Sequence, residues 1–419
     1  MNYILNAKKN NLKFLLQLLY CLIPVSLITG SFFPDLIVSL ISALFVFSCF
    51  RERKFSYFNN KFFLIFFFFY LILILSSLIN NSIFNNSIIF YIRFGIFVVA
   101  ASYLIEIDKK FINILFIIIF LTFLLLCLDS YFQYFFGTNI SGNAYPGIYI
   151  NDFPRLNSFF GNEYKLGSFV VRLFPFLIFV FLIYKRASKF IFFALLFLLS
   201  GIVFLSGERS SLVLLFVTFF FLFFFVKRFY FLVWLFSILI FFFLLYNISF
   251  FKGHKTRVID LSSALYYKNV NTKNVNTKEN IGNFIKNPLL LLNDEYKSIY
   301  SNSIRIFKDN PFFGSGPKSY RVECKKYDPK ACSTHPHQTY LQLLSEVGLF
   351  GFLFVLFIFF YSIFSYFKNI KSNSYVSFIY LGIIINIWPL TSSGNFFNNW
   401  LSVIIFFPLG FLLTNKEKI

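Results

Sequence analysis

The chain is organised as a series of apolar stretches separated by short polar segments. Most of these stretches run for about 15–23 residues, the length that an α-helix needs to cross ~30 Å of hydrocarbon at ~1.5 Å per residue. The pattern predicts an all-α polytopic membrane protein with about twelve transmembrane helices. The predicted helices cover residues 14–33, 36–50, 62–79, 88–105, 111–128, 168–184, 190–206, 211–226, 229–248, 345–367, 375–393 and 400–414.

The charges of the connecting segments predict how these helices are oriented. Both terminal segments and every even-numbered connection contain Lys or Arg, whereas the short connections at 29–35, 80–87 and 395–400 contain neither. Because basic residues are retained on the cytoplasmic side of a membrane, the alternation places both termini in the cytoplasm.

Composition supports the membrane assignment. Of the 419 residues, 58% are apolar and only 13% are charged, whereas about one-quarter of a soluble domain is charged. A formal net charge of +21 would suggest a nucleic-acid partner for a soluble protein. Here the topology accounts for much of the charge, and we expect no nucleic acid. The first apolar stretch is too long for a signal peptide and lacks a small-residue cleavage site, so a retained helix is expected.

Two connections on the predicted outer side are long, at residues 129–167 and 249–344. The second is the only connection large enough to fold as a small unit. We therefore expect transmembrane helices one to nine in residues 1–248, a large periplasmic loop in 249–344, and helices ten to twelve with a cytoplasmic tail in 345–419. Within the loop, order is expected from Ile299 onward, where apolar residues, Gly, Pro and two cysteines occur.

The two loop cysteines, Cys324 and Cys332, lie close together in the sequence. In an oxidising compartment a disulfide is the first interpretation. A second interpretation joins the two cysteines with His335 and His337 in a zinc site, because these are suitable ligand types. Their spacing, however, matches no common zinc pattern. Free thiols are the third. We favour the disulfide and expect no metal.

A histidine-containing segment enters the tenth predicted helix from the outer side. Pro336 disfavours helix at the residue before it, so the helix is expected to begin near His337. His337 would then share a helical face with Tyr340, Leu341 and Leu344. A lone histidine at a helix start is usually a simple interfacial residue, but several polar groups on adjacent turns favour a functional site here. These supporting residues are Gln338, Gln342 and Glu346.

Arginine residues also occur near the predicted outer surface. Arg305 belongs to a short amphipathic segment that Pro311 ends, and Arg209 interrupts the charge pattern in the hairpin between helices seven and eight. Arg93, near the start of the fourth helix, either supports the site or extends to the interface. Guanidinium groups bind phosphate oxygens in a bidentate manner, and histidine takes up a proton near neutral pH. This set favours transfer from a phosphate-linked lipid donor, without a nucleotide cofactor.

The spacing of the histidine segment resembles a known signature. His337-Gln338, nine further residues and Gly348-Leu-Phe-Gly351 are similar to the His-[Asn/Ser/Gln]-x9-Gly-x-x-Gly motif of the O-antigen ligase and polymerase superfamily. The upstream Asn310-Pro-Phe-Phe-Gly-Ser-Gly-Pro317 resembles the lead-in of that family, as does the helix layout. The resemblance implies a GT-C-like, metal-independent glycosyltransferase of a bacterial inner membrane, with its active site facing the periplasm.

The resemblance also implies substrates and residue roles. Glycan would move from undecaprenyl pyrophosphate to an acceptor such as lipid A-core, with His337 as the base and Arg209 and Arg305 binding the pyrophosphate. Arg209-Ser-Ser-Leu212 departs from the usual Arg-x3-Leu of ligases, because Leu comes one position early. Polymerisation of lipid-linked repeat units and protein O-glycosylation therefore stay open. A lipid-glycan transporter is the alternative from another class. Transport usually needs ionisable groups near the middle of the bilayer, whereas the site residues chosen here, apart from Arg93 and Arg172, lie at the outer face.

Overall fold

The computed structural model describes residues 2–81, 88–107, 110–143, 155–184, 188–226, 228–248, 294–372 and 374–414. These residues form helices joined by turns and irregular segments, and no β-strand occurs among them. The α-helices are α1 (Asn2–Ser26), α2 (Phe32–Glu52), α3 (Lys61–Ile79), α4 (Ile92–Ile107), α5 (Lys110–Phe136), α6 (Leu166–Ile183), α7 (Lys189–Leu205), α8 (Arg209–Phe223), α9 (Arg228–Ile248), α12 (Asp294–Asp309), α13 (Tyr320–Glu323), α14 (Thr339–Lys371), α15 (Ser377–Asn386) and α16 (Asn399–Phe406).

The order of apolar helices agrees with the sequence prediction. Six helices are long and apolar enough to cross a membrane, and the described residues contain six shorter apolar helices of 10–17 residues. Each of the twelve predicted helices corresponds to one of these. The all-helical, membrane-type fold is therefore confirmed, whereas the number of membrane crossings stays a prediction. The six long helices are Phe32–Glu52, Lys61–Ile79, Ile88–Glu106, Phe111–Phe136, Leu166–Ile183 and Thr339–Lys371.

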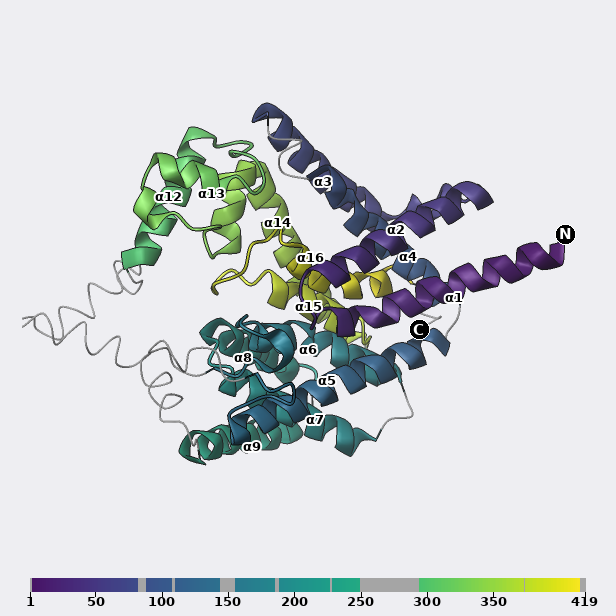
Figure 1. The fold of residues 1–419 in the computed structure, drawn as a ribbon, viewed down its shortest axis with the longest axis vertical. Helices are drawn as coiled ribbons and strands as arrows, with labels where there is room; N and C mark the ends of the chain where they lie inside the picture. Colours follow the sequence, from purple (N-terminus) through teal and green to yellow (C-terminus); the bar gives the residue numbers. More distant parts are fainter. Residues whose placement is uncertain are drawn as a thin grey trace, which may run out of the picture.

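The helices form two groups around a central pair. In Figure 1, α1–α4 lie on one side, α5–α9 lie on the other, and α15 and α16 lie between them. α6 packs against α5, α7, α8 and α15, and 83% of its 18-residue apolar window is buried. Because α6 is apolar on all sides apart from Ser168 and Arg172, it forms part of the interior of the bundle.

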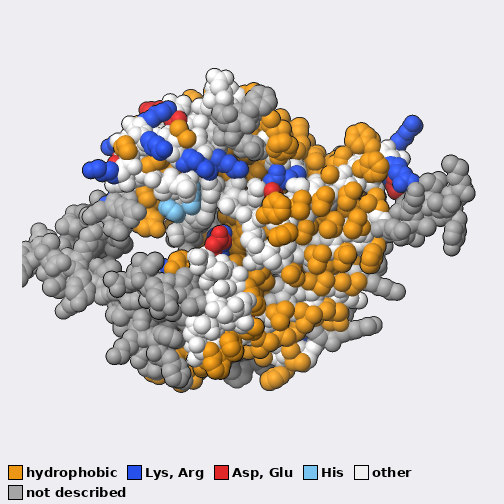
Figure 2. Space-filling model, in the orientation of Figure 1, with side chains coloured by type: hydrophobic (Ala, Val, Ile, Leu, Met, Phe, Trp, Pro, Cys, Tyr) orange, Lys and Arg blue, Asp and Glu red, His pale blue; other side chains and the backbone are white. Residues whose placement is uncertain are grey.

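Large apolar side chains cover much of the outer surface of this bundle. Phe68 on α3, Phe236 on α9 and Phe357 on α14 are each at least 59% exposed. Figure 2 shows the resulting broad apolar face, which is far larger than the patches that soluble monomers expose. Lipid rather than water is the solvent that such a surface requires, so the protein is a membrane protein.

A small unit with its own core covers one end of α14. α12 contributes Ile299 and Ile306, which lie on one face because they are seven residues apart, and these pack with Tyr320 and Cys324. The hydroxyl of Tyr320 donates to the carbonyl of Ile299 at 3.0 Å. Basic side chains gather on this unit, and histidine side chains are visible at its edge (Figure 2).

The eleventh predicted helix is shorter than expected. The prediction ran to residue 393, but α15 ends at Asn386 and residues 387–398 are irregular. Pro389 lacks a backbone N–H and disfavours helix at the preceding residue. Residues 391–395 are Thr-Ser-Ser-Gly-Asn, which favour turns because their side chains compete for backbone hydrogen bonds. The boundary prediction was wrong here, and the irregular segment lies at the candidate site.

Candidate active site

The two glycine-containing parts of the motif contact each other. Residues 310–317 cross α14 at Gly348, where the backbone leaves the helical conformation and the helix kinks. The N–H of Leu349 donates to the carbonyl of Pro311 at 2.8 Å, and the N–H of Gly316 donates to the carbonyl of Glu346 at 2.9 Å. These bonds fix the lead-in segment against the first turns of α14.

His337 lies before α14 rather than within it. The helix begins at Thr339, and His337 has φ 57°, which is uncommon for a residue other than glycine. The carbonyl of His337 accepts a hydrogen bond from the N–H of Ser393 at 2.9 Å. The prediction that the helix begins near His337 is confirmed to within two residues. The prediction that His337 shares a helical face with Tyr340, Leu341 and Leu344 was wrong, because His337 lies outside the helix. A turn held by the irregular segment places this histidine.

Gln338 provides the cap of α14. Its side-chain oxygen accepts from the N–H of Leu341 at 2.6 Å, which satisfies one of the backbone donors left free at a helix start. Its side-chain nitrogen donates to the carbonyl of Pro389 at 2.9 Å. Gln338 thus links the helix start to the irregular segment and has a structural role.

Gln342 continues this link one turn further along. Its side-chain oxygen accepts from the N–H of Phe396 at 2.9 Å. Its side-chain nitrogen donates to Asn395 Oδ1 and to Glu346 Oε2, each at 2.9 Å. Gln342 is 1% exposed, so this buried amide is satisfied by protein groups alone.

Glu346 holds the segment that precedes α13. Its two carboxylate oxygens accept from the N–H of Lys318 at 3.0 Å and from the N–H of Tyr320 at 3.1 Å. Glu346 is fully buried. The three supporting residues predicted from the sequence therefore connect three segments around His337, and none of them lines the cavity described below.

His335 packs directly against His337. The ring centroids are 4.2 Å apart. Nε2 of His335 lies 3.3 Å from the carbonyl of Ser393, and Nδ1 lies 3.0 Å from the hydroxyl of Thr334. Because a carbonyl only accepts, Nε2 carries the proton in the neutral ring. Burial, and next the neighbouring His337, lower the pKa of His335 to about 4, so it is neutral near pH 7.

A polar cavity of about 440 Å³ adjoins these histidines. Its lining comes from α6 and the two residues before it, α8 and its cap, α12, α13, the residues from 334 to 337, the segment between α15 and α16, and α16. The charged and titratable lining residues are Lys165, Arg172, Glu208, Arg321, His335 and His337. The aromatic ones are Tyr164, Tyr296 and Trp400, and the neutral polar ones include Ser168, Ser210, Ser392, Ser393, Asn395 and Asn398.

Arg172 is a buried cation within α6. Its Nε donates to the hydroxyl of Ser168 at 3.0 Å, and its Nη1 lies 3.1 Å from both the carbonyl and the side-chain oxygen of Asn386. Asn386 is the last residue of α15, where helix carbonyls lack partners and a cation is favourable. Arg172 therefore joins α6 to α15 while facing the cavity.

Glu208 caps the start of α6 from the neighbouring hairpin. Its carboxylate accepts from the N–H of Gly167 at 2.7 Å, the N–H of Ser168 at 3.0 Å and the hydroxyl of Ser211 at 2.8 Å. Burial raises the pKa of Glu208 to about 7, although these three donors favour the charged form. An anion at a helix N-terminus is favourable, and Glu208 also offsets the charge of Arg172.

The three arginines predicted as site residues do not line the cavity. Arg209 is the first residue of α8 and is exposed, although its neighbours Glu208 and Ser210 do line the cavity. Arg305 is exposed on α12. Arg93 pairs with Asp35 at 2.6 Å, and this pair ties α4 to α2. The structure therefore brings Arg172 and Arg321 to His337 in place of Arg209 and Arg305.

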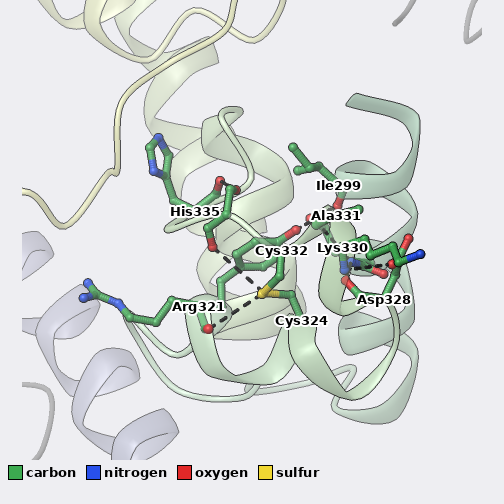
Figure 3. The surroundings of a disulfide bond; sticks show 12 residues. Ile299, Arg321, Cys324, Asp328, Lys330, Ala331, Cys332 and His335 are labelled. Atoms are coloured by element: carbon green, nitrogen blue, oxygen red, sulfur yellow. Dashed lines mark hydrogen bonds between the residues drawn. A yellow bond between two sulfur atoms is a disulfide. The ribbon is translucent and has the colours of Figure 1, made fainter. Parts of the chain in front are cut away.

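Cys324 and Cys332 form a disulfide, with Cα atoms 5.3 Å apart. Figure 3 shows that Arg321 and His335 extend from this region toward the same side, away from the sulfur atoms. The bridge thus connects the end of α13, the short helix that carries Arg321, to the segment that leads to His335 and His337. It also removes the thiolates that the zinc alternative required, and no group of three metal-ligating side chains occurs in the described part of the chain.

Sequence reasoning missed several residues of the cavity. Arg172 carried a signal, because a charge inside an apolar helix is costly and usually functional. Glu208 carried a weaker one, as the acidic neighbour of Arg209 in a short hairpin. Arg321 and Lys165 are ordinary basic residues in polar segments, so nothing in the sequence separated them from the others.

Comparison with known families agrees with this geometry. Residues 193–356 match the family model described as O-antigen ligase. This part of the chain is similar to the O-antigen ligase family. The matched region runs from α7 to the middle of α14 and includes His337, both glycine segments and the disulfide. The resemblance seen in the sequence is thereby confirmed, and the family is one of glycosyltransferase-like membrane enzymes. No curated protein matches the chain.

Proposed function

We propose that the protein is a glycosyltransferase that moves an O-antigen-type glycan from undecaprenyl pyrophosphate to a sugar of lipid A-core. The reaction would take place at the periplasmic face of the inner membrane, with both termini in the cytoplasm and His337 as the general base. The observation that carries this proposal is the cavity that combines His337 with two guanidinium groups. His337 and Arg321 lie within the segment that matches the O-antigen ligase model, and Arg172 comes from α6 outside it.

The proposed chemistry requires one proton acceptor and several cations. His337 would take the proton from the acceptor hydroxyl as its oxygen forms a bond to the anomeric carbon. The bond from that carbon to the pyrophosphate oxygen breaks, and the pyrophosphate leaves with the electron pair. Arg321 would bind the leaving group, because a guanidinium remains charged and contacts two oxygens at once. Arg172 and Lys165 add positive charge to the same cavity.

This assignment changes the residues expected to bind pyrophosphate. Arg209 and Arg305 were the candidates in the sequence, yet both are exposed outside the cavity lining. Arg209 adjoins two lining residues, so we retain it as a candidate at the rim. Arg305 lies on the exposed face of α12 and is assigned no contact with the leaving group.

Transfer by the purified protein tests the proposal. Protein in detergent would be supplied with undecaprenyl-pyrophosphate-linked glycan and lipid A-core, and wild type should form the linked product. Replacement of His337 by Ala should slow transfer by roughly 10²–10⁴-fold, the usual contribution of a general base. His254→Ala is the matched control, because His254 is the one histidine of the chain besides His335 and His337. Normal transfer by the His337 variant would contradict the assigned role.

A deletion strain distinguishes the acceptors. Loss of a ligase should leave full-length glycan on its lipid carrier, whereas loss of a polymerase should leave single repeat units attached to lipid A-core. A transporter would give no transfer in detergent with either acceptor.

A further inference from the structure

The cavity contains two kinds of polar group that suit different parts of a substrate. Its cations come from α6 and from the chain around the disulfide. Its neutral polar groups come mainly from the irregular segment between α15 and α16, which supplies Ser392, Ser393, Gly394, Asn395 and Asn398. Nothing in the proposed transfer chemistry uses this segment.

Hydrogen bonds fix the orientation of the two asparagines in this segment. Oδ1 of Asn395 accepts from the N–H of Phe397 at 2.9 Å, and Oδ1 of Asn398 accepts from the N–H of Trp400 at 2.8 Å. Because a backbone N–H only donates, the atom that faces it in each side chain is the oxygen. Each NH₂ group is therefore on the other side of its carboxamide.

Those NH₂ groups have no protein partner among the described residues, and the hydroxyl of Ser392 has none either. Asn398 and Ser392 are exposed, and Asn395 is half-exposed. All three line the cavity. The segment thus presents a short row of neutral hydrogen-bonding groups, mostly donors, on backbone that is anchored to Gln342 and His337.

Aromatic side chains accompany these groups. Trp400 lines the same cavity, and its indole N–H is held by the carbonyl of Leu27 at 2.8 Å. Tyr164 and Tyr296 also line it. An apolar ring face beside oriented neutral donors is complementary to a sugar, which offers C–H groups on one face and hydroxyl oxygens at its edge. Phosphate would instead be bound by the guanidinium groups.

We infer that the Ser392–Asn398 segment binds the hydroxyl groups of a pyranose at the reaction centre, and that the aromatic side chains of the cavity contact the C–H face of the same sugar. This inference rests on the proposed function, because the sugar is the one that is transferred or the one that accepts it. Donor and acceptor glycans present the same hydroxyl chemistry, so the experiment needs one arm for each.

Conservative substitutions separate sugar binding from folding. Asn395→Asp and Asn398→Asp keep the oxygen that accepts from the backbone and remove the NH₂ donors, and Asp is as good a helix cap as Asn. Asn398→Ser also keeps a cap but adds no charge. Asn60→Asp is the matched control, because Asn60 caps α3 through Phe63 N–H at 2.8 Å and lies outside this cavity.

Two probes report on binding without requiring transfer. They are the lipid-free oligosaccharides released by mild acid from the lipid-linked glycan and from the lipid A-core of the same cells, titrated into the purified protein by calorimetry. We expect at least one oligosaccharide to bind wild type and each Asn variant to weaken it roughly fivefold to tenfold, as for one lost neutral hydrogen bond. The Michaelis constant for that substrate should rise in parallel, which assigns the segment to donor or acceptor.

The outcomes distinguish this inference from the proposed function. If wild type transfers glycan and all three variants keep its binding and Michaelis constants, the sugar-binding inference is wrong and the function stands. If wild type binds an oligosaccharide that the variants bind weakly, yet never transfers glycan, the inference stands and the proposed function is wrong. If wild type neither binds nor transfers, both are wrong.

Discussion

Gly314 and Gly348 each make room for the backbone that carries the other. A Cβ atom on Gly314 would lie 2.4 Å from the backbone nitrogen of Val347, and one on Gly348 would lie 2.3 Å from the carbonyl oxygen of Phe312. Both residues also have positive φ, at 64° and 73°. Two separate requirements, close approach and left-handed backbone, therefore select glycine at both positions of the crossing.

Alanine at either position should destabilise this crossing. We expect Gly314→Ala and Gly348→Ala to lower the thermal unfolding temperature and glycan transfer together, since positive φ alone costs about 1–3 kcal/mol and the overlaps add to it. Gly382→Ala is the control, because no atom lies within 4 Å of its Cβ position in α15. That change should be neutral or stabilise by up to ~1 kcal/mol. Equal stability of the Gly348 and Gly382 variants would contradict the explanation.

Lysine substitutions can rank the four arginines. Arg321→Lys and Arg172→Lys should lower transfer at least tenfold, because an ammonium cannot reproduce a two-pronged contact or the shared bonds to Asn386. Arg209→Lys should have a smaller effect at the rim, and Arg305→Lys should have none. Rates and donor Michaelis constants measured with purified variants provide the comparison. A larger loss for Arg305→Lys than for Arg321→Lys would restore the assignment made from the sequence.

His335 makes stability depend on pH in a predictable direction. Its pKa is about 4 in the folded protein, below the ~6.5 of an unperturbed histidine. Between these values the unfolded chain binds a proton that the folded chain does not, so stability falls as pH decreases from about 6.5 to about 4. His335→Gln should remove this part of the decrease. The thermal unfolding temperatures of wild type and variant at pH 7.5 and pH 5 measure this decrease. An equal decrease in the two proteins would contradict the role assigned to His335.

Glu208→Gln tests the cap of α6. The substitution preserves shape, but its NH₂ group would face a backbone N–H, which leaves one buried donor without an acceptor. We expect a loss of about 1–2 kcal/mol in stability, as for other lost caps. Ser211→Ala removes only one of the three donors to Glu208 and should cost less. Thermal unfolding in detergent compares them, and an unaffected Glu208→Gln variant would show that the charge is dispensable.

Serine at both Cys324 and Cys332 tests the disulfide. With a sequence separation of 8 residues, chain-entropy arithmetic predicts a loss of ~2.5 kcal/mol. The unit that carries Arg321 and His335 should unfold at a lower temperature. A reductant should lower the unfolding temperature of wild type and leave that of the double variant unchanged. If the reductant affects neither, the bridge contributes no stability.

Local pattern was sufficient to predict the fold class and the start of α14 close to His337. The length and apolarity of each stretch determine a helix, because every backbone polar group in hydrocarbon must be satisfied within its own segment. The spacing from His337 to Gly348 is likewise a property of one short stretch of chain. Pro389 and the turn-forming residues after it could have corrected the end of α15.

Only the tertiary structure determines which basic side chains line the cavity. Lys165 and Arg172 lie seven residues apart at the start of α6, whereas Arg321 comes 149 residues after Arg172. The two arginines have the same side-chain chemistry as Arg209 and Arg305. What separates the two sets is which side chains the packed helices enclose and which they leave exposed. That depends on how α6, α8 and the disulfide-linked unit pack around α14. The position of Arg172 inside an apolar helix is a signal in the local sequence, but nothing in the local sequence of Arg321 or Lys165 records these long-range contacts.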